Sequence, residues 1–91
     1  EQSRRGYAEV APDLVVEIRS PNDSWQSLID RAQRFLEAGS RMAVLVEPDQ
    51  FIEVWRARRA PYRLGLDDVF DGEDVLPGFS CRVGDFFPEE E

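Results

Sequence analysis

One short segment organises this chain: Pro12-Asp13-Leu14-Val15-Val16-Glu17-Ile18-Arg19-Ser20. It is rich in β-branched residues, it starts with a proline where a strand can begin, and it ends at Ser20-Pro21. We therefore predict a strand over residues 12–20. Because side chains alternate along a strand, the odd-numbered residues of the segment share one face and the even-numbered residues share the other. The odd face carries Asp13, Val15, Glu17 and Arg19, and the even face carries Leu14, Val16 and Ile18.

The charged odd face has two interpretations. On a central strand, charged groups are costly unless they are paired, solvated in a cleft or bound to a metal, so this face would mark a functional site. On a strand at the edge of a sheet, the same face would simply be wet. The segment alone leaves both interpretations open.

The residues downstream predict an α/β fold. Asp23 and Gln26 have the spacing of a capping box, apolar residues then recur at helical intervals, and Gly39 supplies a stop, so we expect a helix of about four turns. Residues 42–46 form a continuous apolar run, typical of a strand covered on both faces, and residues 47–50 predict a turn into a less buried strand over 51–57, nearer an edge. The order strand, helix, strand, strand contains one right-handed crossover and predicts an α/β sheet.

The remaining segments show weaker patterns. We expect a short further strand over residues 62–66, an acidic surface turn over 67–74 and a loop-rich tail with a short turn over 83–87. The acidic turn lacks the alternating ligands of a calcium loop. Residues 1–11 are weakly patterned and are interpreted as a linker or the remnant of a missing N-terminal half, which leaves residues 12–91 as the domain.

Composition limits the function. A chain of 91 residues buries a modest share of its surface and gains from a partner. The net charge of −8 repels phosphate backbones, so any contact with nucleic acid must be local. All eleven basic residues are arginines and histidine is absent, which removes imidazole from every catalytic proposal. The solitary Cys81 excludes an intrachain disulfide, is expected as a small core residue and fits a cytoplasmic location, and no apolar run is long enough for a membrane span.

Two arginine groups are candidates for function. On a helical wheel Arg31 borders the apolar stripe beside Phe35, so its guanidinium is expected to reach the charged face of the strand, whereas Trp25 and Phe35 are expected to pack in the core. The cluster of Arg56, Arg58 and Arg59, with Arg63 and two aromatic residues nearby, is a candidate contact for nucleic-acid phosphates. Its alternative interpretation is a solvated hairpin end.

Four motifs in order resemble the Uma-type restriction endonuclease family, long catalogued as a domain of unknown function, within the PD-(D/E)XK nuclease superfamily. They are Ala-Pro-Asp-Leu-Val-Val-Glu-Ile-Arg-Ser-Pro-Asn-Asp at 11–23, Phe-Leu-Glu-Ala-Gly at 35–39, Val-Leu-Val-Glu-Pro at 44–48 and Asp-Gly-Glu-Asp-Val-Leu-Pro-Gly-Phe at 71–79. The resemblance covers nearly the whole chain. It implies a partial restriction-endonuclease-like core that hydrolyses DNA phosphodiester bonds with Mg²⁺ or Mn²⁺.

The resemblance also implies roles for three residues. Glu17 matches the metal-binding Glu of the strand motif, Arg31 matches the position of the family's lysine in the helix, and Arg19 has the Glu-x-Lys spacing of the superfamily. Both candidates for the lysine are arginines, which can hold a phosphate but cannot transfer a proton near neutral pH.

The second metal-binding carboxylate of the family is missing from the matched region. Asp13 and Glu17 lie on one strand about 13 Å apart, too far to hold one ion together. The family's Asp lies further upstream, so the chain corresponds to the C-terminal half of the domain. We therefore expect the isolated chain to be inactive, and to form a homo-oligomer through its open sheet edge or to associate with a missing N-terminal half. The alternative is a non-catalytic remnant that serves as an interaction or regulatory module.

Overall fold

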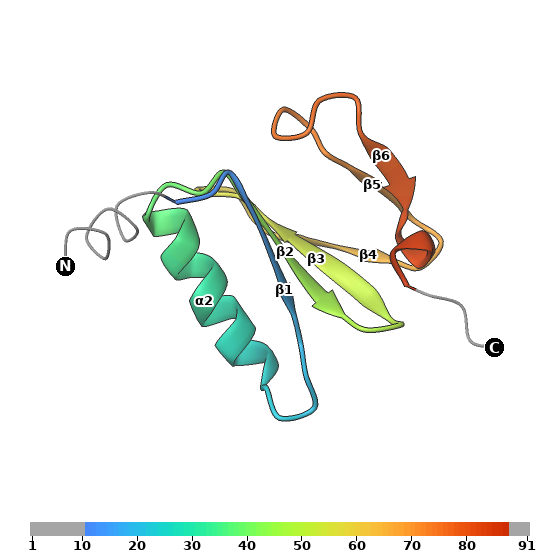
Figure 1. Cartoon of the computed structure of the whole chain (residues 1–91), viewed down its shortest axis with the longest axis horizontal. Coiled ribbons are helices and arrows are strands. Elements are labelled where there is room, and N and C mark those ends of the chain that lie inside the picture. Colours follow the sequence, from blue (N-terminus) through green and yellow to red (C-terminus); the bar gives the residue numbers. More distant parts are fainter. Residues whose placement is uncertain (1–10, 88–91) are drawn as a thin grey trace.

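The computed structural model describes residues 11–87, and these residues form one helix, six strands and a short 3-10 turn (Figure 1). The strands form a four-stranded sheet in the order β1-β2-β3-β4 and a separate two-stranded sheet of β5 and β6. The elements are β1 (Leu14–Ile18), α2 (Trp25–Glu37), β2 (Met42–Glu47), β3 (Phe51–Trp55), β4 (Tyr62–Gly65), β5 (Val69–Asp71), β6 (Ser80–Arg82) and η1 (Val83–Phe86). The linker predicted for residues 1–11 lies, apart from Ala11, outside the described residues.

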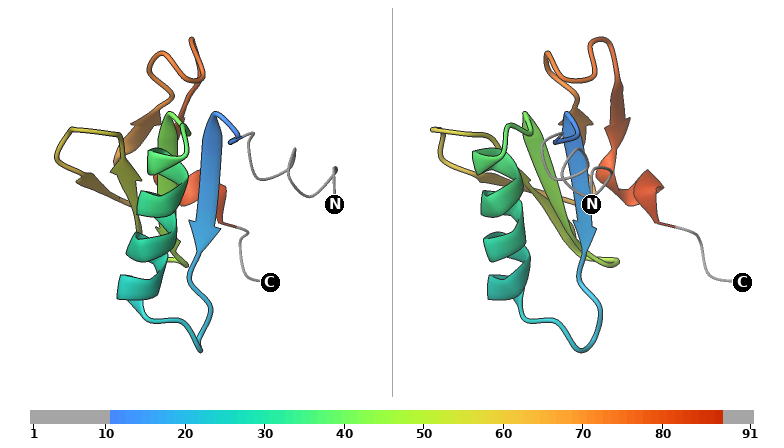
Figure 2. Two further views of the ribbon diagram at one scale, coloured as in Figure 1. Left: turned by 90° about the vertical axis from the view of Figure 1, so that its left-hand side faces the viewer. Right: turned by 60° about the vertical axis from the view of Figure 1, so that its left-hand side comes forward.

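A parallel pair of strands joined by α2 forms the centre of the fold. β1 pairs with β2 in parallel, from Leu14 opposite Met42 to Ile18 opposite Val46. Parallel neighbours need a crossover connection, and α2 supplies it by packing against one face of the sheet, alongside β1 and β2 (Figure 2). Leu28 and Ala32 of α2 are fully buried and pack on one face of the sheet. This face of the sheet contributes Val15, Ala43 and Leu45.

The ends of α2 differ from the prediction at one residue. The N-cap is Ser24, whose Oγ accepts a hydrogen bond from the backbone N–H of Ser27 at 3.1 Å, and not Asp23. Asp23 instead accepts bonds from the N–H and the hydroxyl of Ser20, because the chain turns sharply between β1 and the helix. Gly39 ends the helix as predicted, and its φ of 118° is a conformation that favours glycine.

The antiparallel strands follow the predicted order with shorter bounds. β2 pairs with β3, and β3 pairs with β4, so β4 forms one edge of the sheet. β3 ends at Trp55 instead of residue 57, and β1 covers residues 14–18 instead of 12–20. β3 is less buried than β2, as predicted, although Ile52 and Val54 are fully buried.

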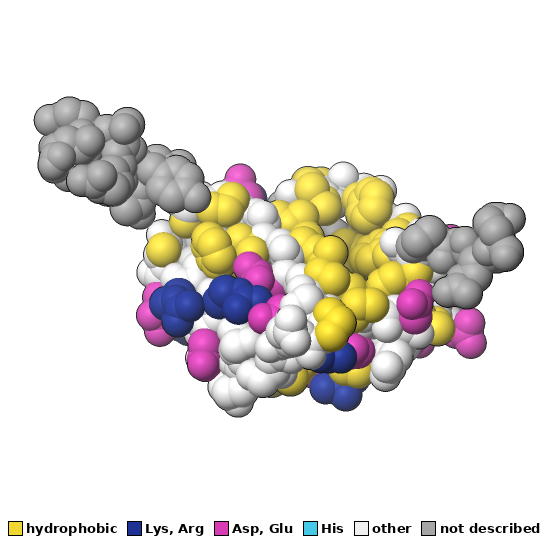
Figure 3. Space-filling model, turned by 60° about the horizontal axis from the view of Figure 1, so that its bottom comes forward, with side chains coloured by type: hydrophobic (Ala, Val, Ile, Leu, Met, Phe, Trp, Pro, Cys, Tyr) yellow, Lys and Arg dark blue, Asp and Glu magenta, His cyan; other side chains and the backbone are white. Residues whose placement is uncertain are grey.

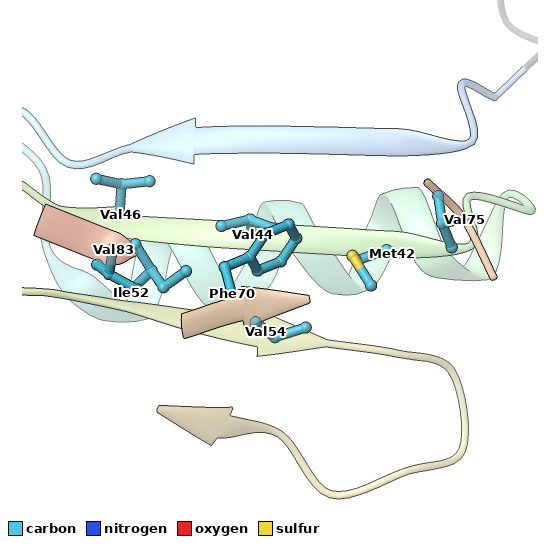
Figure 4. Close-up of a cluster of buried hydrophobic side chains, with 8 residues drawn as sticks. All are labelled: Met42, Val44, Val46, Ile52, Val54, Phe70, Val75 and Val83. Carbon is cyan, nitrogen blue, oxygen red and sulfur yellow. The ribbon is translucent and has the colours of Figure 1, made fainter. Parts of the chain in front are cut away.

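The second face of the sheet is partly covered by a hairpin that the sequence analysis did not predict. Residues 67–74 were expected to be an acidic turn, but Val69, Phe70 and Asp71 form β5 and pair with β6. The reason is Phe70, which turns inward from the acidic stretch and is 3% exposed. Cys81, on β6, is half-buried and lies outside the core in which it was expected. The resulting core contains Met42, Val44, Val46, Ile52, Val54, Phe70, Val75 and Val83 (Figure 4).

We predict that the contact of α2 with the sheet carries a large part of the stability. Leu28→Ala should lower the free energy of unfolding by about 2–5 kcal/mol, because a fully buried leucine is replaced by a cavity. Urea denaturation followed by circular dichroism measures the change. The exposed Gln33→Ala on the same helix is the control and should have little effect. A loss as small as that of Gln33→Ala would contradict this account of the packing.

Candidate functional site

Charged side chains gather where β1 and β2 end, on the face of the sheet that α2 covers. Glu17 lies in β1, Arg19 follows it and Glu47 ends β2. Asp23 lies in the turn before α2, and Arg31 lies in the middle of that helix. They lie together because the parallel pairing places the carboxyl ends of β1 and β2 side by side at one end of the sheet. The crossover then brings α2 back over this end. Carboxyl ends of parallel strands are a common position for binding sites in α/β proteins.

Glu17 and Arg31 form the inner pair of this cluster. Arg31 Nε donates to Glu17 Oε1 at 2.8 Å, so the guanidinium reaches the strand face as its place on the helix predicted. The side chains are 18% exposed for Glu17 and 33% for Arg31, which leaves the pair open to an approaching ligand. Arg31 Nη2 also lies 3.9 Å from Asp23 Oδ2, and the hydrogen bonds from Ser20, aided by the charge of Arg31, lower the pKa of Asp23.

Arg19 is engaged by a carboxylate that the sequence analysis missed. Its Nε and Nη2 donate to the two carboxylate oxygens of Glu47 at 2.5 and 2.8 Å, and Nη1 donates to the carbonyls of Ser20 and Asp23 at 3.2 Å each. The hydrogen bond from Arg19 lowers the pKa of Glu47. Glu47 was interpreted as a turn residue, because its place beside Arg19 depends on the register of the two parallel strands.

The position of β1 answers part of the question that its charged face raised. Within residues 11–87, β1 is the edge of the four-stranded sheet. Glu17 and Arg19 are nevertheless paired and Glu17 is largely covered, so this end of the face is more than a solvent-exposed surface, whereas Asp13 is exposed.

Comparison with known proteins identifies the family of this chain. The Uma2 family model, described as "Putative restriction endonuclease", matches residues 1–84. The chain belongs to this family. Comparison with curated proteins gives no match.

A solved structure shares the fold. It is described as a "putative nuclease belonging to DUF820" from Anabaena variabilis, and it matches with a TM-score of 0.77 at 24% identity over 86% of this chain. The match covers 45% of that structure, so this chain spans less than half of its length. The expected family and the partial nuclease-like α/β core are confirmed. In the described part of this Uma2 chain, no helix is long and apolar enough to cross a membrane.

The residues of one chain do not by themselves suit the divalent metal that the family implies. Residues 11–87 contain no group of three or more acidic, histidine or cysteine side chains that could hold an ion. Glu17 offers one carboxylate, and one of its oxygens already accepts from Arg31. Mg²⁺ and Ca²⁺ prefer several oxygen ligands, so a single copy provides at most a part of such a site.

The second arginine group lies at the opposite end of the sheet and is only partly available to a ligand. Arg56 donates to Glu73 and to Asp74, and its side chain is 10% exposed. Arg59 lies 3.4 Å from Glu73 but is 61% exposed, and Arg58 is exposed in a left-handed turn with φ of 61°. Tyr62 donates to Glu73 as well, and burial together with that carboxylate raises the pKa of Tyr62 to about 12.

We predict that Arg19 sets the ionisation of Glu47. Arg19 lowers the pKa of Glu47 below the ordinary glutamate value of 4.5. The pair therefore stabilises the fold fully at a pH above 4.5, and this contribution is lost as the pH falls through the lowered pKa. In Arg19→Met the pKa of Glu47 should rise, which carboxyl-carbon NMR titration measures. Arg34→Met on the exposed side of α2 is the control. An unchanged Glu47 pKa in Arg19→Met would show that the two groups are not coupled in solution.

Proposed function

We propose that this Uma2 chain is part of an endonuclease that hydrolyses phosphodiester bonds of DNA. The observation that carries the proposal is the pair of Glu17 and Arg31 at the carboxyl ends of two parallel strands. An acidic group beside a fixed cation, both partly open to solvent, suits a reaction in which a phosphate is held and its developing charge is stabilised. Membership of a family whose description is "Putative restriction endonuclease" supports the same reaction class.

Each residue of the cluster has a distinct role in this proposal. Arg31 holds a phosphate oxygen and stabilises negative charge, because a guanidinium stays protonated and presents several donors. Glu17 is the proposed ligand of Mg²⁺ or Mn²⁺, and it contributes one part of that site. Arg19 orients the end of β1 through Glu47, since its donors are already engaged. A single copy, with one carboxylate at the metal position, is inactive in this proposal.

A non-catalytic module is the second candidate. It is favoured by the closed ion pair of Glu17 with Arg31, which occupies the carboxylate, and by arginine in place of the lysine that the family uses. In that case the domain would retain the fold for binding a partner and would cleave nothing.

Plasmid nicking separates the two candidates. Together with the polypeptide that supplies the remaining metal ligands, or at a concentration at which copies of the chain associate, the chain with Mg²⁺ or Mn²⁺ should convert supercoiled plasmid to the open circle. Glu17→Gln should abolish this conversion. Arg31→Ala should slow it by about 10²–10³-fold, as expected for removal of one charge-stabilising donor. Glu37→Gln, an exposed carboxylate on the same helix, is the matched control. Absence of nicking under all these conditions, or equal nicking by Glu17→Gln, would favour the non-catalytic module.

We propose further that the arginines at the opposite end of the sheet contact the nucleic-acid backbone. A groove of about 360 Å³ there is lined by the end of α2, by Arg41 and by residues 56–59. Arg58 and Arg59 supply exposed charge, whereas Arg56 holds the groove together through its acidic partners. The contact is local, as the net charge of −8 requires.

The salt dependence of binding tests this contact. Arg58→Ala should weaken binding of a fluorescent duplex in anisotropy titrations and should reduce the slope of log affinity against log salt by about one. Arg82→Ala, on β6 and paired with Asp85, is the control for a simple change of net charge. Equal effects of the two substitutions would mean that binding responds to overall charge and not to this groove.

A further inference from the structure

The groove at the C-terminal end of α2 has two adjoining parts. The first, of about 360 Å³, is lined by residues 56–59 together with Ser40 and Arg41, and we call it the arginine pocket. The second, of about 500 Å³, shares residues 56–59 and adds Trp55, and we call it the Trp55 pocket. All lining residues of both pockets belong to one internal stretch of the chain, residues 33–59.

The arginine pocket presents positive charge that the fold does not consume. Arg58 is exposed, and Arg59 is 61% exposed with a single long contact of 3.4 Å to Glu73. The C-terminal end of α2 and Glu37, which lines only the Trp55 pocket, add negative potential to the groove. An anion here therefore depends on the arginines, whose planar guanidinium groups suit a phosphate.

Arg58 has a backbone conformation that favours glycine. Its φ is 61°, and it lies in the turn that connects β3 and β4. Side chains other than those of glycine, asparagine and aspartate adopt this conformation at a cost in free energy. The turn would form more easily with glycine, so the arginine side chain at this position indicates a contact outside the fold.

Ser40 is a second residue whose side chain does not serve the fold. Its backbone N–H donates to the carbonyl of Phe35 at 2.9 Å, which fixes it just beyond α2, and the residue is 3% exposed. Its hydroxyl has no hydrogen-bond partner within residues 11–87. A buried hydroxyl without a partner is unfavourable. Because Ser40 lines the arginine pocket, a phosphate oxygen held there is a suitable acceptor.

The Trp55 pocket supplies an aromatic side chain next to these donors. Trp55 is half-buried, and its Nε1 donates to Glu53 Oε1 at 2.9 Å, which restricts the orientation of the indole. The C-terminal half of α2 contributes Gln33 and Leu36 to the same pocket. A pocket of this volume accommodates a nucleobase, and bases stack favourably on tryptophan.

A different concave surface, the apolar groove beside β1, lacks these features. Its volume is about 550 Å³, and Figure 3 shows hydrophobic side chains gathered around a hollow on this side of the molecule. Its lining includes Val16, Ile18, Phe70, Phe79 and Phe86. No lining residue is charged, so this groove offers a phosphate no partner.

We propose that the groove at the end of α2 binds one unpaired nucleotide of a nucleic acid, with its phosphate in the arginine pocket and its base in the Trp55 pocket. This inference rests on the nucleic-acid contact proposed above and adds that the bound nucleotide lies outside a double helix. Bases within a duplex are stacked on one another, so an aromatic side chain inside a pocket reaches only a base that is single-stranded or turned out of the stack. The chain thereby distinguishes an unpaired segment from a continuous duplex.

Tryptophan fluorescence tests the position of the base, because the chain contains two tryptophans. In Trp25→Phe, which leaves Trp55 as the only indole, deoxyadenosine 5′-monophosphate should cause a saturable loss of emission. Deoxyribose 5-phosphate, which lacks the base, should cause none. In Trp55→Phe the remaining Trp25, at the opposite end of α2, is the matched control and should not respond. Equal loss from both tryptophans, or none from Trp55, would overturn the position of the base.

Anisotropy titrations test the preference for an unpaired nucleotide. Trp55→Leu should weaken binding of a fluorescent single strand by about 5- to 150-fold, the loss expected for one base stacked on an aromatic ring. It should leave binding of the duplex of the same sequence unchanged, because the duplex contacts only the arginine pocket. Trp25→Leu, with a half-buried tryptophan at the other end of α2, is the control for a general loss of packing.

The outcomes separate this inference from the functions proposed above. Equal weakening of single strand and duplex by Trp55→Leu would overturn the unpaired nucleotide and leave the phosphate contact intact. Absence of binding to either form would overturn both this inference and that contact. Plasmid nicking, which depends on Glu17, decides the nuclease independently of these results.

Thermal unfolding tests whether the two donors serve the ligand and not the fold. Arg58→Gly should leave Tm unchanged or higher, because relief of the left-handed conformation offsets the greater freedom of glycine in the unfolded chain. Ser40→Ala should also leave Tm unchanged or higher, because it removes a buried hydroxyl without a partner. Both variants should weaken binding of the single strand. A lowered Tm with unchanged binding would show that these side chains are structural and would overturn the phosphate position.

Discussion

The packing of α2 across the parallel pair of β1 and β2 is the constraint on which the rest of this structure depends. Leu28 and Ala32 bury themselves completely against the two strands, and this contact orients the helix along the sheet. Arg31, between them in sequence, is thereby held at the rim of the contact, where it meets Glu17. The candidate site is thus a consequence of core packing, because the same helix that buries the apolar stripe positions the guanidinium at its border.

The two faces of the sheet are closed to different extents. α2 covers one face, whereas the hairpin of β5 and β6 covers only part of the other through Phe70, Val75 and Val83. The remaining part is the apolar groove beside β1. Within residues 11–87 this groove lies next to the edge strand of the sheet, so its apolar side chains are the least covered part of the core.

All basic residues of the chain are arginines, and this determines the geometry of its ion pairs. Arg19 binds both oxygens of Glu47, and Arg56 joins the end of β3 to Glu73 and Asp74 in the loop after β5. Planar guanidinium groups suit such two-point contacts better than an ammonium group does. The consequence for function is that several basic residues serve first to hold the fold, and a count of arginines overstates the charge available to a ligand.

The sequence by itself determined the order of the main elements, the helix stop at Gly39, the alternation of faces along β1 and the place of Arg31 at the border of the apolar stripe. These features follow from local periodicity and backbone preference, which neighbouring residues specify. The tertiary structure alone decided that Glu47 meets Arg19, that Arg56 is enclosed by Glu73 and Asp74, and that Phe70 draws part of an acidic stretch into a strand. Each of these contacts joins residues far apart in the chain or depends on strand register, and local sequence patterns do not specify register between distant segments.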